Sequence, residues 1–140
     1  ENKKITLNEL GYENIVHKVS FWQGDACNLK PNFNSYDLIM ATNLIDRLYN
    51  PKLFLETIHK RLNSDGILMI TSPYSWQESS TQKEMWLGGF VDKNGNEIKT
   101  LNTLKKILNE NFELIHLKDI EFVIKESARK FQHTIAEGSI

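Results

Sequence analysis

Apolar positions along the chain form short continuous runs and one helically spaced stretch, and this pattern predicts an α/β domain. Continuous apolar runs at residues 19–23, 36–42 and 67–70 are typical of strands that are buried on both faces of a parallel sheet. Between the second and third runs, Asn50-Pro51 is typical of a helix start, and apolar residues follow at helical spacing. The strand, helix and strand with short links predict a βαβ crossover.

The segments on either side of this unit predict further elements. Apolar residues before Gly11 predict a helix that ends at this glycine. Residues 92–95 predict a hairpin turn, and Thr100 predicts the cap of a last helix with one apolar face. Residues 112–117 and 131–136 predict two closing strands that pair antiparallel.

Composition and charge exclude several classes of protein. A length of 140 residues favours a single domain, and a net charge of −1 gives no general attraction to nucleic acid or to an anionic membrane. The apolar runs are too short for a membrane span, and residues 1–4 show no signal-peptide pattern. A single cysteine, Cys27, excludes an internal disulfide and favours the cytoplasm. The four histidines lack metal-ligand spacing, so we expect no metal site.

Polar residues directly after two of the predicted strands are the first candidates for chemistry. Asp25 follows the run at 19–23, and Asn43 follows the run at 36–42. Open α/β sheets bind ligands at the carboxyl ends of their strands, which is where both side chains are expected. The alternatives are that Asn43 only shapes a turn and that Asp25 only caps the next one.

Five short motifs occur in an order that resembles one enzyme family. They are GDACNL at 24–29, NLIDRL at 43–48, SPYSW at 72–76, WLGGF at 86–90 and ARKFQ at 128–132. Together they resemble class I S-adenosylmethionine-dependent methyltransferases. Within that class they are most similar to the 4-mercaptohistidine (5-thiohistidine) N-methyltransferase domain of ovothiol biosynthesis.

The resemblance implies a Rossmann-like class I methyltransferase sheet, mostly parallel, with an antiparallel strand pair at its carboxyl end. The family's sheet opens with a βαβ unit that carries a glycine-rich turn, and this chain has no Gly-x-Gly pattern. We therefore expect residues 1–140 to form a single partial domain that holds the third to seventh strands and lacks the first βαβ unit. An aromatic insert at about 74–98 is expected to form a lid over the substrate.

The resemblance also implies S-adenosylmethionine as the cofactor. By this resemblance Asp25 accepts a hydrogen bond from the adenine amine, and the backbone N–H groups of Ala26 and Cys27 meet the ring nitrogens. Asn43 and Leu44 are expected to contact the cofactor at the end of the next strand. Cys27 has no paired base in the sequence, so we interpret it as a small buried hydrophobe and not as a nucleophile.

The acceptor is expected to be the imidazole ring of thiohistidine, and Asn43 and Tyr74 are the predicted catalytic residues. An amide such as that of Asn43 can orient an imidazole through its oxygen or its nitrogen. Each substrate candidate also has a structural alternative: a solvated pair at a helix start, a hydrophobic cluster under a long loop, or an exposed charged turn. The predicted substrate-binding residues are Asp46, Arg47, Trp76, Trp86, Phe90 and Arg129.

Three other functions compete with this hypothesis. The nearest is a methyltransferase for another small molecule, which likeness in fold cannot exclude. The second is an inactive truncated fragment that self-associates through unpaired sheet edges. The third is a nicotinamide-dependent oxidoreductase, which the position of Asp25 and the absence of a dinucleotide fingerprint disfavour.

Overall fold

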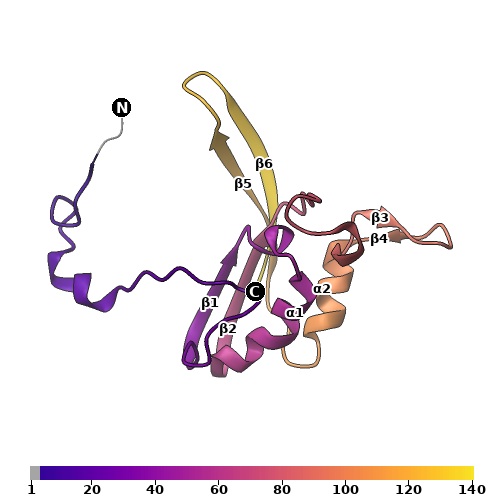
Figure 1. The fold of residues 1–140 in the computed structure, drawn as a ribbon, viewed down its shortest axis with the longest axis horizontal. Helices are drawn as coiled ribbons and strands as arrows, with labels where there is room; N and C mark the ends of the chain where they lie inside the picture. Colours follow the sequence, from indigo (N-terminus) through magenta and orange to yellow (C-terminus); the bar gives the residue numbers. More distant parts are fainter. Residues whose placement is uncertain (1–3) are drawn as a thin grey trace.

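The computed structural model describes residues 4–140 as a four-stranded sheet with two helices on one face (Figure 1). The strand order is β1-β2-β6-β5, and a separate hairpin, β3-β4, precedes the second helix. Residues 1–3, part of the stretch without a signal-peptide pattern, lie outside the described residues. The elements are η1 (Glu13–Lys18), β1 (Tyr36–Thr42), η2 (Ile45–Arg47), α1 (Pro51–Thr57), η3 (Ile58–Arg61), β2 (Leu62–Ser72), η4 (Lys83–Met85), β3 (Phe90–Val91), β4 (Glu97–Ile98), α2 (Thr100–Leu108), β5 (Leu117–Lys125) and β6 (Phe131–Ser139).

The predicted βαβ crossover is confirmed. β1 has the predicted bounds and pairs in parallel with β2, with Ala41 opposite Ile70. Asn50 caps α1 through a 3.0 Å hydrogen bond that its side chain accepts from the backbone N–H of Leu53. This bond satisfies one of the N–H groups that a helix start leaves without an intrahelical partner.

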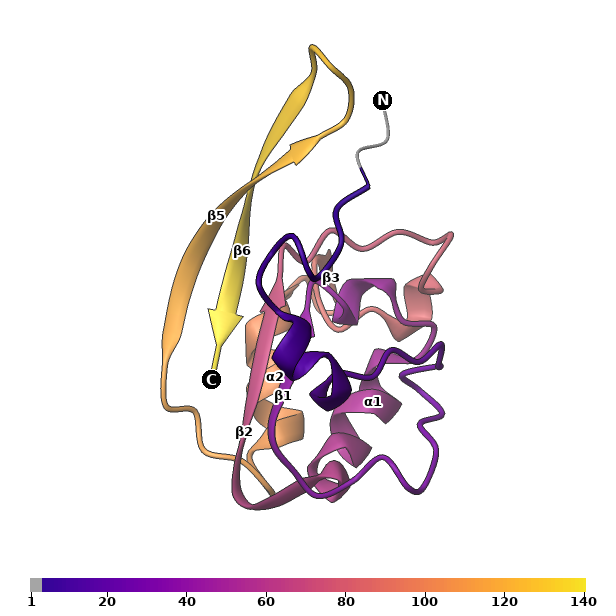
Figure 2. The same ribbon diagram turned by 90° about the vertical axis from the view of Figure 1, so that its left-hand side faces the viewer.

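The closing antiparallel pair is confirmed, but its first strand begins later than predicted. β6 lies between β2 and β5 and runs antiparallel to both. Residues 112–116 are not a strand, because the backbone N–H of Phe112 bonds back to the carbonyl of Leu108 at 2.9 Å and closes α2. Figure 2 shows the β5-β6 hairpin projecting beyond the rest of the molecule.

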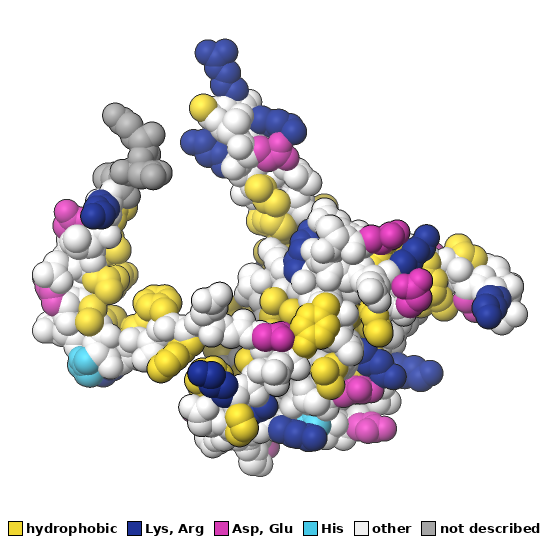
Figure 3. All heavy atoms as spheres, viewed as in Figure 1, with side chains coloured by type: hydrophobic (Ala, Val, Ile, Leu, Met, Phe, Trp, Pro, Cys, Tyr) yellow, Lys and Arg dark blue, Asp and Glu magenta, His cyan; other side chains and the backbone are white. Residues whose placement is uncertain are grey.

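Two predicted elements near the amino terminus do not form. Residues 7–11 make a single turn instead of a helix, and residues 19–23 are extended without strand pairing. We call residues 4–23 the arm. Its aromatic side chains are exposed, with Phe21 at 90% and Trp22 at 69%. A strand needs a neighbour for its N–H and C=O groups, and none of the described strands lies beside this segment. Apolar side chains line the arm where it stands away from the body (Figure 3).

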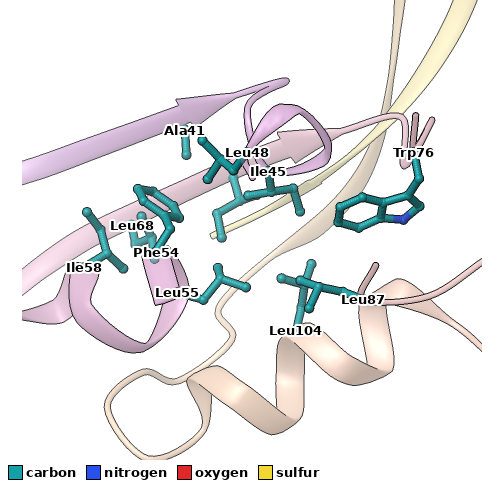
Figure 4. Packing of buried hydrophobic residues seen from close by; sticks show 11 residues of the cluster. Ala41, Ile45, Leu48, Phe54, Leu55, Ile58, Leu68, Trp76, Leu87 and Leu104 are labelled. Carbon is teal, nitrogen blue, oxygen red and sulfur yellow. The ribbon is translucent and has the colours of Figure 1, made fainter. Parts of the chain in front are cut away.

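The core lies between the sheet and the two helices, as Figure 4 shows. β1 and β2 contribute Ala41 and Leu68, and α1 contributes Leu55. Leu104 of α2 closes the far side of this cluster at 2% exposure. No helix in residues 4–140 is long and apolar enough to cross a membrane.

Candidate functional site

A group of polar side chains meets at the carboxyl ends of β1 and β2. β1 ends at Thr42 and β2 at Ser72, so the residues that follow both strands reach the same edge of the sheet. β6 runs in the opposite direction and brings Glu137 beside Ser72. We call this group the polar cluster: Asn43, Asp46, Thr71, Ser72, Tyr74 and Glu137.

Asn43 is fixed at this edge by both its backbone and its side chain. Its N–H donates to the carbonyl of Thr71 at 2.7 Å, and the Thr71 hydroxyl donates to Asn43 Oδ1 at 3.1 Å. Asn43 adopts a left-handed backbone conformation with φ of 49°, which asparagine tolerates better than most residues. The predicted catalytic position is therefore a rigid one, with its amide held in a defined orientation.

Asp46 is a member of the polar cluster that is buried below the surface. It is only 1% exposed. Its Oδ1 accepts from the Ser72 hydroxyl, and its Oδ2 accepts from the backbone N–H and the hydroxyl of Ser75, each at 3.1 Å. The turn after β2 encloses the Asp46 carboxylate, and its contact with substrate stays a prediction.

Arg47 is engaged by the same turn. Its guanidinium lies 3.1 Å from Asp46 Oδ2 and donates to the Ser75 carbonyl at 2.6 Å and to the Ser75 hydroxyl at 3.1 Å. These contacts engage Nη1 and Nη2 of the guanidinium and hold it against the turn after β2. Asp46 and Arg47 were expected either to bind substrate or to form a solvated pair. In the structure, the contacts of Arg47 join η2 to the segment that follows β2, and its binding of substrate stays a prediction.

Tyr74 and Glu137 form the closest side-chain pair of the polar cluster. The Tyr74 hydroxyl donates to Glu137 Oε1 at 2.6 Å, a length typical of charge-assisted bonds to a carboxylate. Burial, followed by this bond and the negative charge of Glu137, raises the pKa of Tyr74 well above its ordinary value. Tyr74 has a φ of 52°, an unusual conformation for a bulky residue, and its N–H bonds to the Ser72 hydroxyl at 3.1 Å.

Sequence reasoning missed Glu137. It lies one residue beyond the predicted end of the last strand, and only the antiparallel return of β6 brings it to this edge. The available signal was the one carboxylate within a closing strand of mixed polar and apolar residues.

The Asp25 loop is folded on itself. Asp25 Oδ1 accepts from the N–H of Cys27 at 2.8 Å, which is the turn-capping role given above as the alternative, and Oδ2 accepts from the Tyr49 hydroxyl at 3.1 Å. The Cys27 thiol donates to the carbonyl of Asn50 at 3.4 Å, and burial raises the pKa of Cys27. A raised pKa keeps the thiol protonated, in keeping with the prediction that Cys27 is not a nucleophile.

An apolar cleft of about 250 Å³ opens beside this loop, on the side of β1. Ala26 and Leu44, both predicted to bind cofactor, line it together with Trp22. Asp25 directly precedes Ala26, which lines the cleft. Apolar walls of this kind suit a flat aromatic ring.

The aromatic insert is packed into the body of the protein. Trp76 is 9% exposed, stacks on Trp86 with ring centroids 6.4 Å apart, and donates from Nε1 to the Thr100 hydroxyl. Thr100 thus begins α2 without capping it, contrary to the sequence prediction. Trp76 is packed as the hydrophobic-cluster alternative describes, and its contact with substrate stays a prediction.

Gly88 lies where the aromatic insert packs closely against the start of α2. A Cβ atom at this position would lie 2.3 Å from the backbone nitrogen of Thr100. Phe90 begins the β3-β4 hairpin, whose turn at 92–95 forms as predicted. Trp86 and Phe90 are half-buried, so their contact with substrate stays a prediction.

Arg129 lies far from the polar cluster. It is in the turn between β5 and β6, where Lys and Arg side chains gather at the tip of the hairpin (Figure 3). Phe131 and Glu137 are six residues apart on β6, which places the tip roughly 20 Å along the strand from the site. Arg129 lies in an exposed turn, as the alternative describes, and its contact with substrate stays a prediction.

A larger cavity, of about 1020 Å³, lies at the opposite end of β2. It is lined by Asn63 and Gly66 near the start of β2 and by Phe112 after α2. Ligands of open α/β sheets bind at the carboxyl ends, so this cavity is not the candidate site despite its size. Residues 4–140 hold no group of three His, Cys, Asp or Glu side chains placed to bind a metal.

Comparison with known proteins decides the family. A family model described as a methyltransferase domain matches residues 2–116. This chain belongs to that methyltransferase family. Among solved structures, it is similar to a Listeria monocytogenes protein described as an S-adenosylmethionine dependent methyltransferase. The two share 13% identity with a TM-score of 0.48 over 95% of this chain and 74% of the other. No curated protein matches.

The predicted enzyme class is therefore confirmed, and S-adenosylmethionine is the methyl donor that this class implies. The oxidoreductase alternative is set aside by the same match. The sheet, with a parallel crossover and a closing antiparallel pair, has the α/β fold class that the sequence predicts.

Proposed function

We propose that this methyltransferase transfers a methyl group to a ring nitrogen of the imidazole of 5-thiohistidine, a step of ovothiol biosynthesis. The observation that carries the proposal is the polar cluster at the carboxyl ends of β1 and β2. It coincides with two of the motifs, at 43–48 and 72–76, on which the resemblance to the thiohistidine enzymes rests. We further propose that residues 1–140 are part of a methyltransferase domain and that the protein is cytoplasmic.

The proposed cofactor site comprises the Asp25 loop and the apolar cleft beside it. Ala26 and Leu44 offer the cleft walls, and the backbone of Cys27 adjoins them. Asp25 is free to receive an adenine amine once the Tyr49 hydroxyl, now 3.1 Å from Oδ2, turns away. S-Adenosylmethionine supplies an electrophilic methyl group when bound, so the protein must mainly orient the acceptor and exclude water.

Asn43 and Tyr74 are the residues proposed to orient the acceptor. The Thr71 hydroxyl donates to Oδ1 of Asn43 and so fixes the plane of the side-chain amide. The direction of the two Nδ2 hydrogens is fixed with it. The Tyr74 hydroxyl is protonated at neutral pH, as its ordinary pKa of 10.0 already requires, and burial and Glu137 raise this pKa further. Both side chains therefore present fixed polar atoms to a ring, as a displacement reaction with strict alignment requires.

The test is methyl transfer from S-adenosylmethionine by the 140-residue chain, with 5-thiohistidine and histidine as matched acceptors. The expected result is methylated 5-thiohistidine and unreacted histidine. Binding of S-adenosylhomocysteine without transfer to 5-thiohistidine would keep the methyltransferase class and remove this substrate in favour of another small molecule.

A second candidate, self-association, is favoured by one observation. Among the described strands β1 is an edge, and Leu38, Met40 and Ile67 are exposed on the sheet face opposite the helices. An unpaired edge beside an apolar face is a template for pairing with a second copy. Light scattering on the chain tests this: a dimer supports it, and a monomer at all concentrations removes it.

A further inference from the structure

Glu137 lies in the polar cluster at the carboxyl ends of β1 and β2, although no sequence motif includes it. It pairs across the sheet with Ser72 on one side and with Asp119 on the other. Directly opposed residues on neighbouring strands project to the same face, so Glu137 shares a face with the last residue of β2. Its bond to Tyr74 then ties it to the turn that follows β2.

One oxygen of this carboxylate is used and the other is available. Oε1 accepts from Tyr74 at 2.6 Å. Within residues 4–140 no side chain or backbone group donates to Oε2. Glu137 is half-buried, and a carboxylate that is partly withdrawn from water gains from each further donor that it binds.

The charges around Glu137 determine which kind of hydrogen-bond donor its carboxylate favours. Asp119 lies opposite it on β5, and the buried Asp46 lies beneath the same turn. Arg47, which contacts the polar cluster, is directed to Asp46 and Ser75. This end of the sheet therefore carries excess negative charge, which favours a positively charged or N–H-bearing group over a carboxylate.

We infer that Glu137 is a specificity-determining residue that binds an N–H group of a nitrogen heterocycle of the imidazole class, with Tyr74 fixing the orientation of its carboxylate. This inference rests on the proposed function and deepens it by naming the side chain that recognises the ring.

The experiment is a titration of the chain with imidazole at pH 6, followed by the NMR shifts of the backbone amides around residue 137. The expected result is saturable binding to the wild type, at least tenfold weaker binding to Glu137→Gln, and binding within twofold of the wild type for Glu121→Gln. Glu121 is a matched control, because it is an exposed carboxylate on the neighbouring strand. Equal binding by Glu137→Gln, or no binding by the wild type, would overturn the inference.

Two further measurements separate this inference from the proposed function. If imidazole binding depends on Glu137 but 5-thiohistidine is not methylated, the inference stands and the substrate proposal fails. If Glu137→Gln methylates 5-thiohistidine with the same KM and kcat as the wild type, the substrate proposal stands and the inference fails. Titration with S-adenosylhomocysteine, which we expect Glu137→Gln to bind normally, shows that the variant is folded.

Discussion

Asp46 shows how a single buried carboxylate organises the residues above it. Its two oxygens collect four donors, from Ser72, Ser75 and Arg47, while only 1% of the residue meets solvent. A buried charge of this kind is stable only while its hydrogen bonds are complete. The turn that presents Tyr74 thus depends on Asp46.

Replacing Asp46 should therefore destabilise the fold. Asp46→Ala leaves the fully buried Ser72 hydroxyl and the Ser75 N–H without their acceptor and removes the buried ion-pair partner of Arg47. We expect a loss of about 3 kcal/mol in the free energy of unfolding. Urea denaturation measures this loss. The exposed Glu78→Ala is the control and should change stability by less than about 0.5 kcal/mol. Similar values for both variants would contradict the role given to Asp46.

The raised pKa of Tyr74 predicts that the free energy of unfolding falls at alkaline pH. In the unfolded chain this phenol ionises near its ordinary pKa of 10.0, whereas in the folded protein burial and Glu137 raise the pKa. The folded state then holds a proton that the unfolded state loses, so the stabilisation is complete below about pH 10 and falls as pH rises above it.

The measurement is urea unfolding between pH 8 and pH 11. We expect the stability of the wild type to fall more steeply above pH 10 than that of Tyr74→Phe. The control is Tyr12→Phe, which removes an exposed tyrosine and should keep the wild-type slope. If Tyr74→Phe follows the same slope as the wild type, Tyr74 does not retain its proton on folding.

At the scale of elements, the aromatic insert is an extension of the core and not a loose loop. Trp76 and Trp86 stack on each other, and Leu87 is buried beside them at 6% exposure. The close approach of Gly88 to the start of α2 makes this packing possible. The stacked tryptophans are therefore part of the packed body of the protein.

Adding one methyl group at Gly88 tests this packing. Gly88→Ala places a Cβ 2.3 Å from the backbone of Thr100, so the insert must shift, and we expect a loss of about 2 kcal/mol or more. Gly24→Ala is the matched control, because its added Cβ would meet nothing within 4 Å. Thermal unfolding of both variants measures the difference, and equal melting temperatures would show that the insert yields easily.

The elements that sequence reasoning predicts well are those that carry their own local signals. Asn50-Pro51 marks the start of α1, and the apolar run at 36–42 marks β1. The run at 19–23 has the same pattern but no strand beside it, and periodicity cannot show whether a partner exists. Glu137 enters the site only through the antiparallel pairing of β6 with β2, which is a long-range contact that no local pattern encodes.

At the scale of the whole molecule, the chain divides into a packed body and an exposed arm. The guanidinium of Arg61 donates to the carbonyls of Leu29 and Lys30 at 2.9 Å each, which anchors the loop before β1 to the body. Before that anchor, residues 4–23 expose most of their apolar side chains (Figure 3). The arm and the body should therefore differ in their access to a protease.

Chymotrypsin should cut the arm before the body. We expect the first cleavage after Phe21 or Trp22, because both are exposed on unpaired backbone, whereas Trp76 is packed in the core. Mass spectrometry of early time points identifies the fragments. The double variant Phe21→Gln with Trp22→Gln should delay the first cut, and early cleavage at Trp76 would contradict the division into arm and body.

The three tryptophans also give the protein an intrinsic optical probe of its cleft. Trp76 and Trp86 are stacked together away from the cleft, while Trp22 lines it and is open to water. The fluorescence of Trp22 should therefore be red-shifted and readily quenched by iodide, over a shielded background from the other two. A purine that enters the cleft would cover this indole and reduce the quenching, so ligand binding can be followed by light alone, without a label and without turnover.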